Sequence, residues 1–359
     1  MSPSIDVLLL IALPASGKSE VRRFLNWLQQ RYPHIFRMFG FGEHVAELDD
    51  YPYVEFMRMV DRVLRSLDLP PIFFFQPIEG EEQPFCDSRE WGVLARLLKD
   101  DYDHITDSVP TLSSRDAIYD LFERLDRAAN KVGIGVRFTA MSRVDRSRLV
   151  AGLLDLVESQ DQGELRRDNA GKSLIRRPYH WRVKSLKNTT VIVECARGGP
   201  EGATMPLDGA NGYQYTLPLL GSEILRRASV LNIKVTPDDS RRRNRERATP
   251  PPGCTDTTLF HGVSEAVMRR SYGVCDLAHM IESSGVANCL RVVCDGTDYL
   301  VPVGIFDNCG RGCTDAVREK RDNLDALTEA ERDPLFFGLF RAFCLGIIPG
   351  VEAAKRAVA

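Results

Sequence analysis

The chain has 359 residues, of which 43% are hydrophobic and 27% charged, as expected for a globular protein with one large core or two smaller ones. Its formal net charge of −3 excludes a general basic field for binding nucleic acid, so that such a role needs a local basic patch. Nine cysteines, an odd number at irregular spacing, favour reduced thiols in the cytoplasm over a disulfide framework.

The first predicted element is a buried strand over residues 5–13, IDVLLLIAL. No basic region precedes its apolar residues, and they lead directly into Gly17-Lys18-Ser19, which favours a strand over a secretory signal peptide. The residues from Glu20 to Tyr32 are typical of a helix. The sequence therefore predicts a buried strand, a loop of small residues and a helix, in that order.

This order is suited to binding the phosphates of a nucleotide. Backbone N–H groups of the loop and the positive helix N-terminus would face the β-phosphate, while Lys18 would reach the β- and γ-phosphate oxygens and act in catalysis. The Ser19 hydroxyl would ligate Mg²⁺. The residues expected to contact the nucleotide form one continuous segment, namely Pro14, Ala15, Ser16, Gly17, Lys18 and Ser19.

The loop departs from the usual pattern at two positions, where Ala12 and Ala15 replace glycines. If either position needs a positive φ, alanine costs about 1 kcal/mol or more. We therefore expect nucleotide binding to be weakened but not abolished. A second Gly-Lys-Ser, at 171–173, follows no apolar strand and is interpreted as a chance match.

Acidic residues end two predicted strands. Asp49 and Asp50 end the segment HVAELDD, and one of them is expected to act as the general base that accepts the proton of an attacking hydroxyl. The alternative is an N-cap for the helix that follows. Glu194 lies near the end of TTVIVECA and is expected to act in catalysis, as a ligand of Mg²⁺ or in contact with the acceptor. Its alternative is a salt bridge with Arg197.

The remaining pattern predicts an α/β protein. Further strands are expected at 228–236 and 298–306, and strands that alternate with helices favour a mostly parallel sheet flanked by helices. Residues 104–188 are expected to form a mainly helical insertion in a core made of 1–103 and 189–359. The run Phe73-Phe74-Phe75 is expected to pack in the core, with the lining of an acceptor pocket as the alternative.

A basic segment, SRRRNRER, follows the strand at 228–236. Arginines stabilise the charge that phosphoryl transfer spreads over the equatorial oxygens, so Arg242, Arg243 and Arg245 are candidate catalytic residues. On a helix Arg245 would share a face with Arg241, and Arg243 with Arg247, so not all can reach one site. The alternatives are a solvated helix and a nucleic-acid patch.

The apolar run from Leu335 is interrupted by Arg341 and Pro349. It is shorter than the roughly 20 apolar residues needed to span a bilayer. We therefore expect a buried C-terminal helix, no membrane partner and a cytoplasmic location.

With these segments in view, the chain resembles the nucleoside/nucleotide kinase-like branch of the P-loop NTPases. It is more closely similar to a group of bacterial kinase-like P-loop proteins without an assigned substrate. The similar segments cover most of the chain outside 104–188 and the C-terminus: ALPASGKSE, ELDDYP, VIVECARGG, VTPDDSRRRNRER, FHGVSEAVMRRSYG and VPVGIFDN. The resemblance implies five parallel strands in the order 2-3-1-4-5, an ATP·Mg²⁺ site and an arginine lid at about 241–284. It also implies that backbone near Phe306 to Asn308 approaches the nucleotide, with Asn308 as a binding residue.

The leading hypothesis is a phosphotransferase that moves the γ-phosphoryl group of ATP·Mg²⁺ to a small-molecule, nucleoside or nucleotide acceptor. A second hypothesis is a kinase for nucleic-acid 5′ ends, which would use the basic helix and the run RRDNAGKSLIRR at 166–177. A third is a regulator that binds ATP and hydrolyses it slowly or not at all. A strand-end base and a lid favour the kinase, whereas the altered loop favours the regulator.

Overall fold

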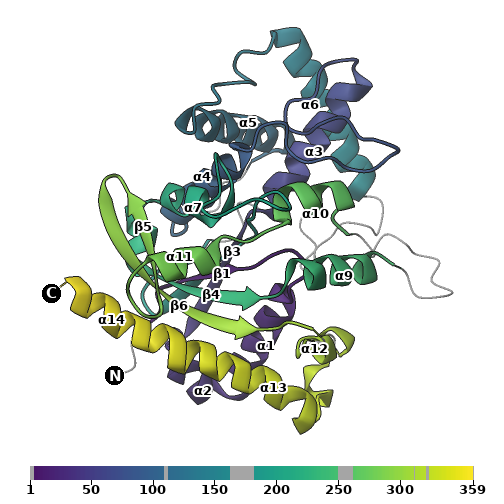
Figure 1. The fold of residues 1–359 in the computed structure, drawn as a ribbon. Helices are drawn as coiled ribbons and strands as arrows, with labels where there is room; N and C mark the ends of the chain where they lie inside the picture. The colour runs from purple at the N-terminus through teal and green to yellow at the C-terminus, as the bar shows by residue number, and fades with distance from the viewer. Residues whose placement is uncertain are drawn as a thin grey trace.

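The computed structural model describes residues 4–108, 112–161, 182–249, 262–310, 312–320 and 323–358. The second Gly-Lys-Ser, the run at 166–177 and the middle of the expected lid, 250–261, lie outside the described residues. Figure 1 shows a central sheet with helices on both faces and a further layer of helices at the top of the view, above the helices that cover one face.

The sheet has six strands in the order β2-β3-β1-β4-β6-β5. The strands are β1 (Val7–Ile11), β2 (His44–Asp49), β3 (Thr189–Cys195), β4 (Ala228–Lys234), β5 (Cys289–Cys294) and β6 (Thr297–Asp307). Neighbours from β2 to β6 pair in parallel, and β5 pairs antiparallel with β6. The predicted α/β class with a mostly parallel sheet flanked by helices is confirmed.

The expected count of five strands in the order 2-3-1-4-5 is wrong, because β5 forms an additional edge strand before β6. The two strands are joined at Asp295 and Gly296, whose φ values are 50° and 75°. Two successive positive φ angles are the geometry of the tight turn that Asp-Gly favours between antiparallel strands. The Asp-Gly pair after CLRVVC was therefore a usable signal in the sequence for this hairpin.

Both faces of the sheet are buried, as its apolar strands require. In β1 alternate residues serve opposite faces: Val7, Leu9 and Ile11 belong to one hydrophobic cluster, and Leu8 and Leu10 to another. The first face is covered by α4 (Glu90–Asp103), α7 (Gly212–Thr216), η2 (Pro218–Leu220), α8 (Gly221–Arg227) and α11 (Leu277–Ser283). The second is covered by α1 (Lys18–Arg31), α2 (Pro33–Met38), α12 (Asp315–Glu319), α13 (Glu329–Phe340) and the π-helical segment η5 (Arg341–Ile347).

The helical layer is larger than residues 104–188. Its helices are α3 (Tyr51–Ser66), part of α4, α5 (Ser114–Lys131) and α6 (Arg143–Asp161). The helices expected in the insertion are present as α5 and α6. They share a hydrophobic cluster with α3 and α4 from the preceding part of the chain. Helix α10 (Glu265–Tyr272) joins the same cluster, while α9 (Pro237–Ala248) follows β4. A short helix, η4 (Leu324–Ala326), precedes α13.

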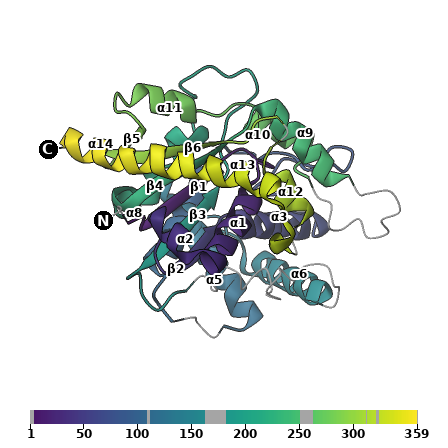
Figure 2. The same ribbon diagram turned by 90° about the horizontal axis from the view of Figure 1, so that it is seen from below.

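The C-terminal helices run along the sheet, as Figure 2 shows from below. Leu335, Leu339 and Phe343 are fully buried against it, whereas Phe337 and Leu345 are 55% and 62% exposed. The helix is thus buried on one face only. The C-terminal helix is continuous over Glu329–Ala357, with α14 (Ile348–Val358) at its end. By length and composition alone it is long and apolar enough to cross a membrane, so the expectation that it is too short to do so is wrong. The cytoplasmic location stays a prediction.

Candidate active site

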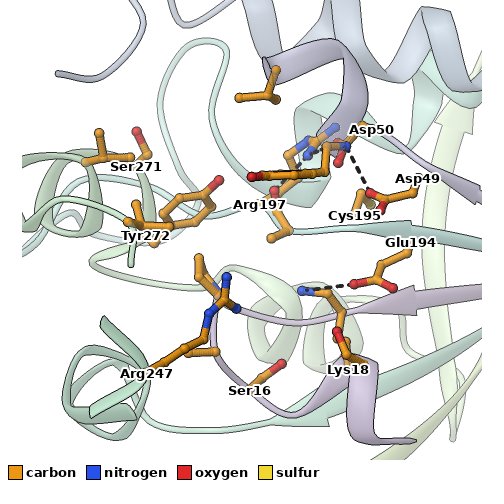
Figure 3. Close-up of a pocket in the computed structure, with 18 of the residues that line it drawn as sticks. Ser16, Lys18, Asp49, Asp50, Glu194, Cys195, Arg197, Arg247, Ser271 and Tyr272 are labelled. Carbon is orange, nitrogen blue, oxygen red and sulfur yellow. Dashed lines mark hydrogen bonds and ion pairs between the residues drawn. The ribbon is translucent and has the colours of Figure 1, made fainter. Parts of the chain in front are cut away.

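A cavity of about 410 Å³ lies at the carboxyl ends of β1, β2 and β3. We call it the central cavity (Figure 3). Its lining comes from the loop after β1, the ends of β2 and β3, helices α3, α9 and α10, and the segment that precedes α4. The parallel strands of the sheet all end on this side, so residues distant in the sequence meet in one place.

The loop between β1 and α1 forms one end of the central cavity, which residues 14–19 all line. Helix α1 begins at Lys18, with Gly17 as its N-cap and no side chain bonded to its first amides. The buried Ser16 hydroxyl has no hydrogen-bond partner within the described residues. Free N-terminal amides, a buried hydroxyl and the Lys18 ammonium together make this end suited to an anion.

The conformation of the loop places strain on Ala15, which has a φ of 53°. Gly17 has a φ of 100°, and a Cβ added there would lie 2.7 Å from the Thr314 Oγ1. Glycine is therefore needed at position 17. At position 15 an alanine occupies the left-handed region, at a cost of about 1–2 kcal/mol. Ala12 is buried at the end of β1 and is not among the residues with positive φ.

Asn308 lies behind the loop, outside the residues that line the cavity. Its Nδ2 donates to the Ser16 carbonyl oxygen at 2.7 Å. The Arg243 Nη2 donates to the carbonyl oxygens of Asn308 at 2.6 Å and Gly310 at 2.9 Å. The Asn308 side chain thus supports the loop, and the expected direct contact with a nucleotide stays a prediction.

The two strand-end carboxylates lie side by side, because Asp49 of β2 pairs in register with Glu194 of β3. The Lys18 Nζ is 4.0 Å from the Glu194 Oε1, and the Arg22 Nη1 is 3.2 Å from the Glu194 Oε2. Arg22 also pairs with Glu47 at 3.1 Å. The alternative in which Glu194 pairs with Arg197 is wrong, because Arg197 pairs with Asp50.

Asp49 is the carboxylic acid in the cavity with the most perturbed acidity. Burial, followed by the nearby carboxylates of Glu194 and Asp50, raises its pKa to about 7. Its Oδ1 accepts a hydrogen bond from the Tyr51 backbone N–H at 2.9 Å, so it also holds the first turn of α3. An acid with a pKa near 7 can exchange a proton readily at neutral pH.

Asp50 forms a buried ion pair. Its Oδ2 lies 2.6 Å from the Arg197 Nη1, and the two side chains are 11% and 2% exposed. Burial is the largest single influence on the pKa of Arg197 and lowers it, but the Asp50 carboxylate together with Cys195 and Tyr272 raises the pKa overall, so the guanidinium stays charged. Asp50 is also the N-cap residue of α3, although its side chain makes no capping bond.

The candidate arginines point in different directions. Arg243 is buried and lines the cavity, where its hydrogen bonds go to backbone carbonyls. Arg242 pairs with Asp239 and Glu246, and Arg245 is 63% exposed and pairs with Glu265. Arg247 reaches the cavity from α9 (Figure 3). The basic helix thus sends Arg243 and Arg247 to the cavity, and Arg242 and Arg245 away from it.

Three further arginines of the cavity were not predicted, namely Arg22, Arg58 and Arg318. They lie on α1, α3 and α12, where an arginine in the sequence is typical of a solvated helix face. Spacing gave one usable signal, since Arg22 follows Lys18 by four residues and so shares its helix face.

The donors available for a metal ion are few. The Ser19 hydroxyl and the Glu194 carboxylate both line the cavity. Within the described residues, no group of three or more His, Cys, Asp or Glu is placed to hold a metal. Mg²⁺ in phosphate-transfer sites usually takes one or two protein ligands and completes its shell with water and phosphate oxygens. The two donors therefore fit Mg²⁺ held together with a nucleotide, and they do not make an independent metal centre.

A scan against protein-family models, a search of curated proteins and a search of solved structures found no match to this chain. The function is therefore inferred from the geometry of the site.

Proposed function

We propose that the chain is a phosphotransferase of the P-loop type, which transfers the γ-phosphoryl group of ATP·Mg²⁺ to a hydroxyl-bearing acceptor. One observation carries the proposal. Lys18 and Ser19, at an uncapped helix N-terminus, line the same cavity as the carboxylates that end β2 and β3. Phosphoryl transfer requires this combination of an anion site, a metal ligand and a base.

Each residue has a role in the proposed reaction. The loop amides, Ser16 and Lys18 would bind the phosphates, and Ser19 with Glu194 would hold Mg²⁺, which when bound would supply neutralisation of phosphate charge. The acceptor oxygen forms a bond to the γ-phosphorus while the bond from that phosphorus to the bridging oxygen of ADP breaks. The acceptor proton passes to the Asp49 carboxylate, whose pKa of about 7 suits a general base.

Arg247 and Arg243 line the cavity from α9. Arg247 would stabilise the transferred group, and Arg243 would position the loop. The Glu194 carboxylate lies 4.0 Å from the Lys18 ammonium. That contact would orient Lys18 before the nucleotide arrives.

Nucleotide binding is the first test. At about 100 times its Kd, ATP·Mg²⁺ should stabilise the protein by about 2.7 kcal/mol in thermal unfolding. Lys18→Ala should lose this stabilisation, whereas Lys99→Ala, a change on the surface of α4, should retain it. An unfolding midpoint of the wild-type protein that does not respond to saturating ATP·Mg²⁺ would sink the proposal.

Transfer is the second test, since it separates a kinase from a nucleotide-binding regulator. ADP release from ATP should increase when the correct acceptor is added and depend on Asp49. Stabilisation by ATP·Mg²⁺ without acceptor-dependent ADP release across a broad set of hydroxyl compounds would favour the regulator, with the strained Ala15 as its structural basis.

A further inference from the structure

The end of the central cavity remote from the loop differs sharply from the end beside it. Four aromatic residues, each buried to nine-tenths or more, line it there: Phe74, Phe85, Trp91 and Tyr272. Phe74 and Phe85 stack with centroids 4.5 Å apart, Phe85 meets Trp91 edge to face at 4.9 Å, and Trp91 meets Tyr272 at 5.6 Å. We call these four rings the aromatic wall.

The aromatic wall comes from separate parts of the chain. Phe74 and Phe85 belong to the segment between α3 and α4, Trp91 to the first turn of α4, and Tyr272 to the end of α10. Phe73 and Phe74 pack in the core as expected, and Phe74 also lines the cavity. Phe75 departs from the expectation, since it is 42% exposed.

Two arginines that line the central cavity beside the aromatic wall, Arg58 and Arg197, are paired with carboxylates. The Arg58 Nη1 pairs with Glu55 at 3.2 Å and with Glu82 at 2.7 Å, and its guanidinium lies 5.6 Å from the Phe74 ring centroid. Arg197 lies 5.0 Å from the Trp91 ring centroid and pairs with Asp50. A phosphate or carboxylate placed at the wall would have to compete with these acids for both guanidinium groups.

Uncharged polar groups that line this end are Gln83, Ser271 and the Tyr272 hydroxyl. The apolar side chains of Val54, Val263 and Val267 also line the cavity. Figure 3 shows the Tyr272 ring with its hydroxyl pointing across the cavity towards Arg197. A polyol or sugar would leave several hydroxyl groups without partners there, which is costly in a buried site. A flat apolar ring would instead stack on the wall and meet the few polar groups at its edge.

We infer that the acceptor is an uncharged compound with an aromatic ring, in which the reacting hydroxyl is attached to the ring or lies a few bonds from it. Nucleosides belong to this class. The ring lies against Phe74, Phe85, Trp91 and Tyr272, and the hydroxyl points back to Asp49 at the junction with the phosphate end. The role of that hydroxyl as acceptor rests on the proposed function, but the ring-binding site does not. Acceptors that are already phosphorylated are disfavoured.

The experiment measures binding and transfer separately. Saturation-transfer NMR and thermal unfolding are recorded for the full chain with three sets of probes: the nucleosides uridine and adenosine, their 5′-monophosphates, and ribose. We expect ring protons of the nucleosides to receive saturation, the monophosphates to bind at least fivefold more weakly, and ribose to show no binding. The ATP·Mg²⁺ stabilisation is measured on the same samples.

Variants test whether the nucleoside binds at the aromatic wall. Tyr272→Leu should weaken nucleoside binding about tenfold, within the range found when one stacking side chain is removed, and leave the ATP·Mg²⁺ stabilisation unchanged. Tyr272→Phe keeps the ring and should recover most of the affinity. Phe75→Leu changes an exposed neighbour outside the cavity and serves as the control. Phe85→Leu repeats the test on a different element if Tyr272→Leu does not fold.

The outcomes separate the two proposals. Ring compounds that bind at the wall without any response to ATP·Mg²⁺ would overturn the proposed function and retain the aromatic site. A response to ATP·Mg²⁺ with tighter binding of ribose or of the monophosphates would overturn the inference and retain the proposed function. A short oligonucleotide with a 5′-hydroxyl that binds far more tightly than its nucleoside, with a steep dependence on salt, would also overturn it in favour of nucleic-acid ends.

Discussion

The buried pair of Asp50 and Arg197 makes the sharpest prediction about the site. Asp50→Asn keeps the shape of the side chain and leaves the Arg197 guanidinium, which is 2% exposed, without its counter-charge. Removal of one partner of a buried ion pair costs about 3–5 kcal/mol. Arg197 cannot relieve the loss by releasing its proton, because its pKa is far above neutral even with Asp50 absent.

The expected shift in thermal unfolding follows from chain length. An unfolding entropy of about 2.1 cal/mol/K per residue gives roughly 0.75 kcal/mol/K for this chain, so the midpoint should fall by about 4–7 °C. Asp155→Asn, on the exposed side of α6, is the matched control and should change stability by less than about 0.5 kcal/mol.

A double variant completes the test. Asp50→Asn with Arg197→Met removes both charges, so that no buried charge is left without its partner. The double variant should therefore be more stable than Asp50→Asn alone. A loss below about 1 kcal/mol for the single variant, or no recovery in the double variant, would refute a structural pair and return Asp50 to the list of candidate bases.

Three further predictions concern the reaction and the loop. If Asp49 is the base, it must be ionised to accept the proton, so kcat/KM should rise with pH up to about 7 and level off above it. Asp49→Asn should abolish this rise and lower the rate about 10²–10⁴-fold, and an unaltered pH profile in that variant would contradict the assignment. Ala15→Gly should relieve the left-handed strain and raise stability in urea by about 0.5–1 kcal/mol, whereas a loss of stability would show that the φ of 53° is not strained. Arg247→Ala should lower kcat by about 10³-fold with little change in KM for ATP, while Arg245→Ala should stay close to wild type, and equal small losses in both would point to a diffuse phosphate-binding patch.

The elements around the site could be predicted from local sequence, because each depends on short-range signals. The apolar run before Gly17-Lys18-Ser19, the strands HVAELDD and TTVIVECA with their terminal acids, and the basic segment SRRRNRER all correspond to elements that the structure contains. The order of elements in a parallel sheet then brings the strand ends together.

Pairing partners and side-chain directions could not be predicted in the same way. Helical spacing separated the arginines of α9 into faces, but which face meets the cavity depends on how α9 packs against the loop after β6. The partner of Arg197 was mistaken because Glu194 is close in sequence, whereas Asp50 approaches from a different strand end. Only one ring of the aromatic wall lay within a predicted segment, because the lining of an acceptor pocket was the alternative for the Phe73–Phe75 run. The other three rings were missed, since they come from further along the chain.

The contacts behind the loop link two regions that a kinase would use at different moments. Arg243 of α9 bonds the carbonyl oxygen of Asn308, whose own side chain bonds the carbonyl oxygen of Ser16. Helix α9 therefore cannot swing as a rigid body without loosening the support of the loop after β1. If this loop binds phosphate as proposed, its occupancy and the position of α9 are thermodynamically linked. A ligand that holds α9 in place would then raise the affinity for phosphate by the same factor by which phosphate raises the affinity for that ligand.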